Sequence, residues 1–339
     1  MTNWSTQQTK SLWLLVIAVA GLFVIALTAG PTALSLGNAI NDILNGALNG
    51  KTTSLDATIL RDIRLPRALL ALMVGATLGV CGAAMQGLLR NPLACPSVIG
   101  ISNGAALGAV IALYFGWSGL FFLAVPFTAI FGAGIATLLI FLLAGRDASV
   151  TTLILAGVAI NALGGALIAL ALNFAPNPYA MSELVYWLLG SLSNRSIDDV
   201  YLALPFMLVG WLFLMRSSNY LNALSLGEDT AQSLGFSPGT ERTQLILGVA
   251  LCVGAAVAVS GSIGFVGLVV PHLLRPMANN EPGKLLGFSA LGGAALVLLA
   301  DCAVQWLSPW QELKLGVITS LIGGPFFLYL ILSTRNSLQ

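Results

Sequence analysis

Long apolar stretches, separated by short polar segments, follow one another along almost the whole chain. The stretches without Asp, Glu, Lys or Arg include Ser11–Asn41, Ala68–Leu89 and Asn91–Gly145. A membrane-spanning helix needs about 20 consecutive apolar residues. The stretch Asn91–Gly145 is therefore long enough for two helices, and Gly116–Gly119 predicts the turn between them.

This pattern predicts ten membrane helices, of which the eighth is short. The apolar stretch Thr243–Leu274 is interrupted at Gly261–Gly264, which leaves a piece too short to cross a membrane. Half-length helices occur at membrane depth where protein or a cavity surrounds them. We expect an all-α, polytopic membrane protein with a single transmembrane domain over residues 1–339. The helices are expected at roughly 12–33, 66–88, 96–113, 120–143, 149–172, 199–215, 243–261, 265–278, 286–304 and 314–334.

The composition excludes most other classes of protein. Apolar residues make up 57% of the chain and charged residues 8%, whereas a soluble globular protein carries about 25% charged residues. So few charges cannot cover the surface of a soluble enzyme of this length. The net charge of +1 offers no basic surface for nucleic acid. The four cysteines lack paired spacing, so neither a disulfide framework nor a metal site is expected.

The distribution of basic residues predicts the orientation in the membrane. Ten spans put both termini on one side, and an inside N-terminus places eight Lys and Arg residues inside and six outside. This excess agrees with the positive-inside rule, so both termini are predicted to be cytoplasmic. The first apolar stretch is interpreted as a retained span and not as a cleaved signal peptide. The outer basic cluster Arg61–Arg67 is the exception to the rule.

The sequence contains a weak internal repeat. A shift of 179 residues aligns Val74–Gly82 with Val253–Gly261, with identity at five of nine positions, and places Pro92 on Pro271. The predicted helices 2 and 7 cross the membrane in opposite directions. Helices 2–5 and 7–10 are therefore expected to form an inverted repeat, as in many transporters. Chance similarity between helices rich in small residues is the alternative.

Three patterns could carry chemistry. Gly50–Thr52 resembles the end of a phosphate-binding loop but lacks its first glycine and a preceding strand, so ATP binding is assigned to another chain. Ser118 within Gly116–Gly119, together with His272, would suit an intramembrane serine protease, but the two residues are expected near opposite membrane surfaces. Asp301 could be a proton or cation site of a secondary transporter. A helix-end carboxylate bonded to a nearby Ser, Thr or backbone N–H is the favoured interpretation.

The inner loop over residues 217–240 is the longest segment expected on the cytoplasmic side. Gly227, Gly235 and Gly239 divide it into two expected short helices, and Asp229-Thr230 lies at a helix start. A compact two-helix projection suits insertion into the groove of a partner protein, and a solvated connector is the alternative.

A series of motifs then resembles one transport family. The run Arg64–Gly108 (RLPRALLALMVGATLGVCGAAMQGLLRNPLACPSVIGISNGAALG), together with LSLGEDTAQSLG at Leu224–Gly235 and GSIGFVGLVVPHLLR at Gly261–Arg275, is similar to the FecCD-type permeases. Further matches are LILAGVAINAL (Leu153–Leu163), YWLLGSL (Tyr186–Leu192) and ELKLGVITSLIGGPFFLYL (Glu312–Leu330), so the resemblance covers nearly the whole chain.

The resemblance implies the membrane subunit of a type II ABC importer in a bacterial inner membrane. Such permeases have ten helices and work as dimers of identical or paralogous subunits, with two ATP-binding subunits inside and a periplasmic or lipid-anchored binding protein outside. Transport follows from alternating access at the dimer interface, along a path lined largely by helices five and ten. A ferric siderophore is the expected cargo, followed by haem and cobalamin. No catalytic residue, cofactor or metal site is expected.

The resemblance also implies roles for individual residues. The loop 217–240 would provide the coupling helices that contact the ATPase. Arg64 and Arg67, three residues apart, would present donors outward to acidic residues of the binding protein, and anchoring at lipid phosphates is the alternative. Cys95, Ser262, Lys314 and Gln305 depart from the family pattern, as does Val150. The expected cytoplasmic gate comprises Asn91, Pro92, Leu93, Ser149 and Val150; the expected periplasmic gate comprises Tyr186, Trp187 and Gly190; the expected ATPase-coupling residues are Leu224, Gly227, Glu228, Asp229, Thr230, Leu234 and Gly235.

Overall fold

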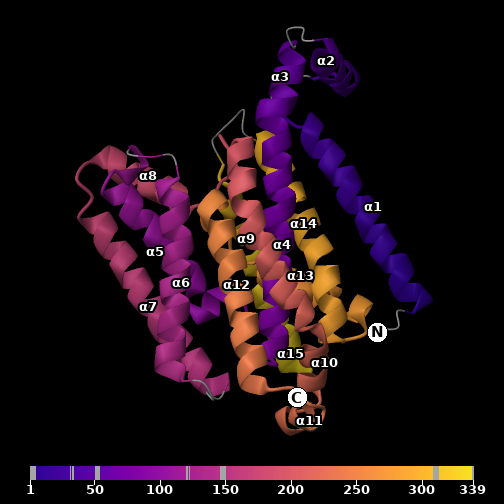
Figure 1. Cartoon of the computed structure of the whole chain (residues 1–339), viewed down its shortest axis with the longest axis vertical. Coiled ribbons are helices and arrows are strands. Elements are labelled where there is room, and N and C mark those ends of the chain that lie inside the picture. Colours follow the sequence, from indigo (N-terminus) through magenta and orange to yellow (C-terminus); the bar gives the residue numbers. More distant parts are fainter. Residues whose placement is uncertain are drawn as a thin grey trace.

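The computed structural model is a bundle of helices, and its described part contains no β-strand (Figure 1). It describes residues 5–30, 32, 34–49, 54–119, 121, 123–145, 150–307 and 313–337. Ten helices correspond to the ten that were predicted. They are α1 (Thr6–Thr28), α4 (Leu65–Leu88), α5 (Ile101–Tyr114), α6 (Ala124–Ala144), α7 (Val150–Asn173), α9 (Ile197–Arg216), α12 (Pro238–Ser260), α13 (Val266–Leu274), α14 (Pro282–Leu307) and α15 (Leu315–Ser337).

Short helices decorate the two ends of this bundle. At the end drawn uppermost in Figure 1 lie α2 (Leu36–Asn49), α3 (Leu55–Ile59) and α8 (Pro178–Leu188), and we call this the α8 end. At the opposite end lie α10 (Ser218–Ser225) and α11 (Glu228–Ser233), which we call the knob, and this is the knob end. Seven helices of the described chain are long and apolar enough to cross a membrane.

The first helix begins and ends earlier than the expected 12–33. Ser5 accepts a hydrogen bond from the backbone of Gln8, whose side chain accepts one from the backbone N–H of Ser5. This capping box satisfies two N–H groups that a helix start leaves without partners. Hydropathy alone had placed the boundary after Lys10, because the polar first turn carries no apolar signal.

The second membrane helix also begins earlier than the expected residue 66. A single π-helical turn over Leu60–Arg64 joins α3 to α4, so the helical path runs from Leu55 to Leu88. Pro66 has no N–H for the usual bond to the preceding turn, and proline therefore often ends or kinks a helix. The wider π turn directly before it lets the helix continue.

The helices α4 and α12 form the buried centre of the bundle. Among the candidate spans, the apolar window of α4 is 89% buried and that of α12 is 78% buried. Glycines bring the backbones close together: a side chain on Gly75 would meet the backbone of Gly293 on α14, and one on Gly82 would meet Gly267 on α13. Small residues thus permit the close helix contacts that are typical of membrane proteins.

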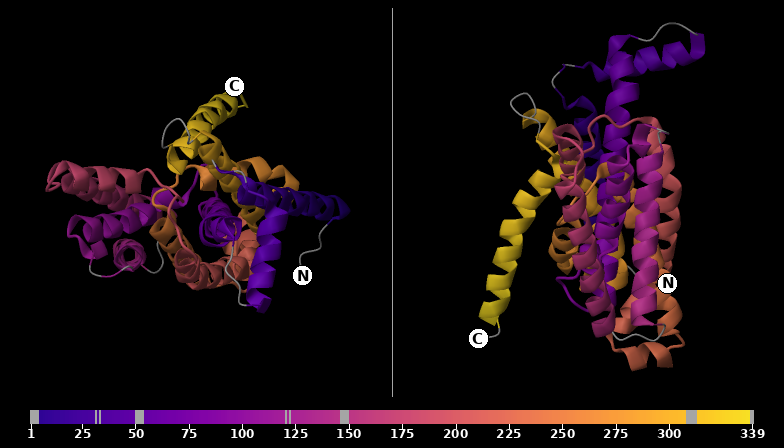
Figure 2. Two further views of the ribbon diagram at one scale, coloured as in Figure 1. Left: turned by 90° about the horizontal axis from the view of Figure 1, so that it is seen from above. Right: turned by 90° about the vertical axis from the view of Figure 1, so that its left-hand side faces the viewer.

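The packing of the two halves follows the pattern expected of the repeat. The helix α4 of the first half packs on α13 and α14 of the second half. The corresponding helix of the second half, α12, packs on α5 and α6 of the first half. Likewise α5 packs on α6 and α7, as α13 packs on α14 and α15. Figure 2 shows α15 diverging from the bundle toward the C-terminus.

The predicted break after the seventh helix is present. α12 ends at Ser260, the chain turns at Gly261, and the short α13 starts after Phe265, whose φ is +65°. Protein surrounds this break because α8 and the start of α15 pack beside it. The non-helical backbone is therefore accommodated in the way membrane depth requires.

Candidate functional sites at the two ends of the bundle

The knob has the two short helices expected between residues 217 and 240. Gly227 and Gly235 adopt φ values of +119° and +91°, which favour glycine and set the turns after α10 and α11. Leu224 of α10 is buried, whereas Leu226 and Leu234, which directly follow α10 and α11 and are counted with the knob, are 69% and 62% exposed. The knob therefore presents two apolar side chains on a polar surface.

Buried contacts hold the knob on the bundle. The Tyr220 ring is fully buried and lies 5.8 Å from the Phe236 ring, centroid to centroid. Burial raises the pKa of the Tyr220 hydroxyl, which keeps this side chain neutral. Arg242, at the start of α12, forms a 2.9 Å ion pair with Glu228 of α11. Glu228 therefore supports the knob from within the chain, and Asp229 and Thr230 are exposed.

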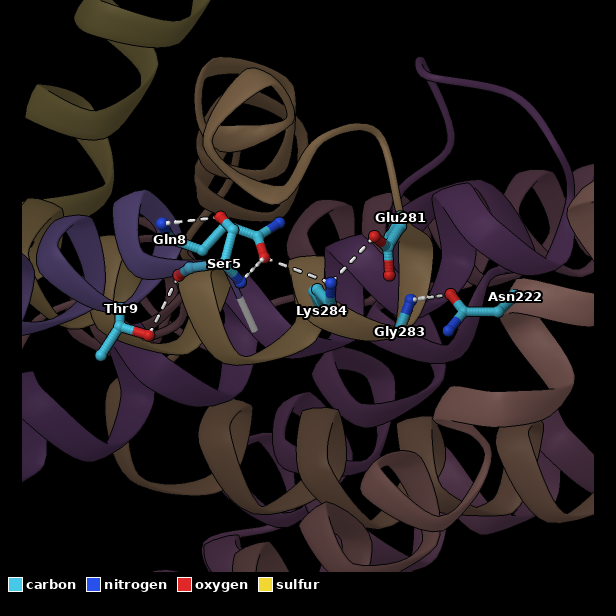
Figure 3. A network of polar contacts seen from close by, with 7 residues as sticks. All are labelled: Ser5, Gln8, Thr9, Asn222, Glu281, Gly283 and Lys284. Atoms are coloured by element: carbon cyan, nitrogen blue, oxygen red, sulfur yellow. Dashed lines mark hydrogen bonds and ion pairs between the residues drawn. The ribbon is translucent and has the colours of Figure 1, made fainter. Parts of the chain in front are cut away.

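A polar network joins the knob to the first residues of α1 and α14 (Figure 3). The ammonium group of Lys284 is buried and donates to Gln8 at 3.2 Å and to Glu281 at 2.9 Å. The adjacent Gly283 donates its backbone N–H to Asn222 of α10 at 2.7 Å. The knob is therefore bonded directly to the start of α14.

The expected cytoplasmic gate lies at this same end. Asn91, Pro92 and Leu93 are exposed in the turn after α4, where the Asn91 side chain accepts a hydrogen bond from the Leu93 N–H at 2.9 Å. Val150 is the first residue of α7. Ser149 lies outside the described residues.

At the α8 end, a cavity of about 550 Å³ lies against α8. Tyr186 and Trp187, two of the expected periplasmic gate residues, line it together with Arg195 and Lys314. The Lys314 ammonium lies 4.9 Å from the centre of the Tyr186 ring, a cation–π contact. Burial lowers the pKa of Arg195, and Asp199 at 3.9 Å partly offsets this shift.

Three glycines form the junction beneath this cavity. Gly190, the third expected gate residue, has a φ of +72°, and a side chain there would meet the backbone of Ser262. A side chain on Gly261 would meet the Trp187 carbonyl, and one on Gly316 would meet the Leu189 carbonyl. The end of α8, the α12–α13 break and the start of α15 are therefore in backbone contact.

We expect Gly261→Ala to destabilise this junction. Its backbone, at φ +67° and ψ −162°, is a conformation open essentially to glycine alone, and strain of this kind costs about 1–3 kcal/mol. The thermal midpoint in nanodiscs should fall. Gly264→Ala is the matched control because nothing lies within 4 Å of its added carbon. Equal midpoints for the two variants would contradict the tight junction.

The expectation that Arg64 and Arg67 present their donors outward is wrong for this structure. Arg64 is 5% exposed, and its guanidinium donates to the carbonyls of Leu27 and Thr28 at 3.1 and 2.7 Å. Arg67 forms a two-pronged ion pair with Asp301, with bonds of 2.8 to 3.1 Å. The charged groups turn inward because antiparallel packing brings the ends of α1 and α14 beside the start of α4.

This ion pair also explains Asp301, which the sequence left with two interpretations. Asp301 is fully buried and accepts a hydrogen bond from a second partner, the Gln305 amide, at 2.9 Å. A carboxylate held by a guanidinium and an amide is a structural ion pair, which disfavours a proton or cation site. The favoured interpretation, a hydrogen-bonded structural carboxylate, is confirmed, but its expected partners, a nearby Ser, Thr or backbone N–H, are wrong. The sequence offered no signal for Arg67 as the partner.

The remaining candidates for chemistry have no support in the described structure. Residues 50–53 lie outside it. His272 faces the Phe326 ring at 5.8 Å, and its Nδ1 atom is buried without a hydrogen-bond partner among the described residues. No serine is bonded to it there, so the geometry of a Ser–His pair is not formed.

Comparison with known proteins agrees with the arrangement of helices, break and knob. The sequence profile of the FecCD transport family matches residues 14–333, nearly the full length. The chain belongs to the FecCD transport family. The vitamin B12 import system permease protein BtuC of Citrobacter koseri is 39% identical over 274 residues, covering 81% of this chain and 83% of BtuC.

One further relative and one solved structure are similar to this FecCD-family chain. The hemin transport system permease protein HmuU of Yersinia pestis is 40% identical over 279 residues, covering 81% of this chain and 83% of HmuU. A solved structure, described as an inward-facing metal-chelate type ABC transporter, has a TM-score of 0.85 and 31% identity. It covers 96% of this chain and 99% of the solved one.

The residues expected to depart from the FecCD pattern have partners in this chain. Gln305 donates to Asp301. Lys314 lies over the Tyr186 ring. Cys95 has its sulfur 2.9 Å from the Ser97 hydroxyl. The sequence did not identify Lys284 and Leu226 as functional candidates, because their roles depend on contacts or exposure and not on a motif.

Proposed function

We propose that this FecCD-family membrane protein is the permease of an ATP-driven importer for a metal chelate, with a ferric siderophore as the first candidate cargo and haem and cobalamin next. The observation that carries the proposal is the knob: two short helices, fixed to the bundle, that expose Leu226 and Leu234. Relatives named for hemin and vitamin B12 import support the cargo class.

In this proposal the knob end faces the cytoplasm and contacts an ATP-binding subunit. An exposed leucine at the end of a fixed helix is a suitable anchor for a groove, because its burial removes apolar surface from water. The network of Lys284, Gln8 and Asn222 then passes the movement of the ATPase to α14 and α1. Both termini are proposed to be cytoplasmic.

A second permease subunit, identical or paralogous, would complete the path. The helices α7 and α15 expose large apolar side chains, among them Leu155 at 65% and Leu321 at 68%. Either lipid or a partner can cover such surfaces. The resemblance of the chain to dimeric permeases favours a partner over part of them, with the path between α7 and α15 of the two subunits.

The gates are proposed at the two ends of this path. Asn91, Pro92 and Leu93, with Ser149 and Val150, would form the cytoplasmic gate. Tyr186, Trp187 and Gly190 would form the periplasmic gate, next to the cavity of about 550 Å³. A binding protein would dock at the α8 end. There Arg67, whose side chain is 17% exposed, could contribute only its outer edge while it stays paired with Asp301.

The double variant Leu226→Asp/Leu234→Asp tests the proposed function. It replaces both apolar anchors with charges that cannot be buried without a partner, so binding of the ATPase and chelate-dependent ATP hydrolysis should fall at least about tenfold. The measurement uses the permease with its co-encoded ATPase and binding protein in nanodiscs, with labelled ferric siderophore, haem and cobalamin in parallel.

Gln7→Asp is the matched control, since it adds a charge at an exposed position of the same end, in the first turn of α1 and outside the loop 217–240. Its ATPase coupling should stay at the wild-type level. Uptake by the wild-type protein that persists without an ATPase would contradict the proposal, as would normal coupling in the double variant.

A further inference from the structure

A polar pocket of about 210 Å³ lies at the knob end, beside the knob but separate from its leucines. It is formed where α4 and α13 end and where α14 begins, and α10 closes one side. Its polar lining is formed by Gln86, Arg90, Ser225, Arg275 and Asn280. Two of these five side chains are cationic, and none is acidic.

The Arg275 side chain is held in place by a buried relay. Its guanidinium donates to the Gln86 side-chain oxygen at 2.7 Å. Gln86 is 2% exposed, and its amide nitrogen donates in turn to the carbonyl of Leu268 on α13 at 3.3 Å. This relay uses one nitrogen of the guanidinium and leaves other donors of the rigid fork for a ligand.

Arg90 occupies a position that usually favours glycine. Its φ is +47°, and the Asn91 N–H donates to the Gln86 carbonyl at 3.2 Å, which closes the end of α4 in the manner of a Schellman motif. An arginine in this left-handed conformation is less favourable than glycine. Its presence points to a use for the side chain, which is exposed and lines the pocket.

The pocket carries uncompensated positive charge. Within the described part of the chain, neither Arg90 nor Arg275 lies within ion-pair distance of a carboxylate. Two other cations of the knob end differ in this respect, since Arg242 is paired with Glu228 and Lys284 with Glu281. Partial negative charge at the ends of α4 and α13 favours cations there. Helix ends alone explain neither the conformation of Arg90 nor the relay through Gln86.

We propose that this pocket receives an acidic side chain of the ATP-binding subunit. The inference rests on the proposed function and adds a second, electrostatic contact to the apolar contact of the knob. A carboxylate has the charge and planar shape that a guanidinium binds with two hydrogen bonds. The pocket wall at Ser225 directly precedes the turn between the knob helices, so a subunit that grips the knob would cover the pocket.

A soluble protein fits this pocket better than a lipid phosphate. The pocket opens at the end of α4, the helix whose apolar window is 89% buried among its neighbours. Figure 1 shows that end of α4 beside α10, within the outline of the bundle. Lipid headgroups have easier access to the perimeter, and a subunit docked on the knob has direct access to this face.

Two variants separate binding from folding. Arg90→Gly removes the cation while relieving the left-handed backbone, so the thermal midpoint should hold or rise. Arg275→Gln keeps a hydrogen-bonding side chain near Gln86 and removes the charge. Each variant should weaken association of the full-length permease with its ATP-binding subunit about tenfold or more. Arg216→Gln, an exposed arginine at the same end outside the pocket, is the matched control.

Association is measured in nanodiscs over a range of salt concentrations, and bound phospholipid is measured by native mass spectrometry. A photo-crosslinker at Ser225 should mark a peptide of the ATP-binding subunit that contains Asp or Glu, and reversing that acid to Arg should partly restore binding to Arg275→Glu. Wild-type association in both pocket variants would overturn the inference. Loss of bound phospholipid with intact association would also overturn it and would assign the pocket to a lipid headgroup.

The outcome for the wild-type protein separates this inference from the proposed function. If the wild-type permease binds no ATP-binding subunit, the proposed function itself fails. If the wild type binds and the Leu226→Asp/Leu234→Asp variant does not, the proposed function stands. The two arginine variants then decide the pocket alone.

Discussion

Gly82→Leu should leave almost no folded or transport-active protein. A side chain on Gly82 meets the backbone of Gly267 at its first carbon, and three more carbons would follow. Neither α4 nor α13 can yield, because both backbones lie in the buried centre of the bundle. Overpacking by even a few methylene groups costs about 1–3 kcal/mol, and a clash with backbone exceeds that range.

The measurement is the yield of monodisperse protein by fluorescence-detected gel filtration, together with chelate uptake. Gly134→Leu on α6 is the matched control, since Gly134 is exposed and nothing lies within 4 Å of its added carbon. We expect this control to express at the wild-type level. A Gly82→Leu protein with normal yield and uptake would show that the α4–α13 contact is looser than the structure indicates.

Asp301→Asn is the second change with a large expected effect. It removes the charge partner of Arg67, and Arg67 is too enclosed to regain full hydration. Breaking a buried pair by changing one partner costs about 3–5 kcal/mol. We expect a lower thermal midpoint and a lower yield. The double variant Arg67→Gln/Asp301→Asn should recover part of the loss because no unpaired charge remains.

Asp62→Asn is the control for this experiment. Asp62 also forms an ion pair with an arginine, Arg61, but the two side chains are 47% and 62% exposed. Such surface pairs contribute about 0–1 kcal/mol. Normal stability of Asp301→Asn combined with lost transport would instead favour the proton- or cation-coupled alternative, and would contradict a structural role for the pair.

The two predictions test different kinds of long-range contact. The sequence indicated part of the Gly82 contact but not the partner of Asp301. The repeat of small residues around Gly82 was visible in the alignment with Val253–Gly261, although the partner helix was not. For Asp301 the sequence placed an acid at membrane depth but suggested only nearby partners. Arg67 lies 234 residues away in the chain, and no local pattern links the two positions.

The candidate sites show the same division. The knob was predicted with its two helices and its glycine turns, because turn residues and helix starts are local signals. The gate positions at Tyr186 and Gly190 came from resemblance and stay predictions. The pocket of Arg90 and Arg275 had no signal in the sequence, since its walls come from four helices that meet only in the folded chain.

The sequence by itself determined the class of this protein, the number of its membrane helices, the break before the short eighth helix, and the knob. These features follow from hydropathy over one helix length, and from glycine, proline and capping residues that act within a few positions. Only the tertiary structure decided where the charged side chains point. Arg67 turns toward Asp301, and Lys284 toward Gln8, because helices in close contact create partners that no local sequence pattern encodes. A charge buried in an apolar bundle is stable only with such a partner, so its orientation is a property of the packed chain.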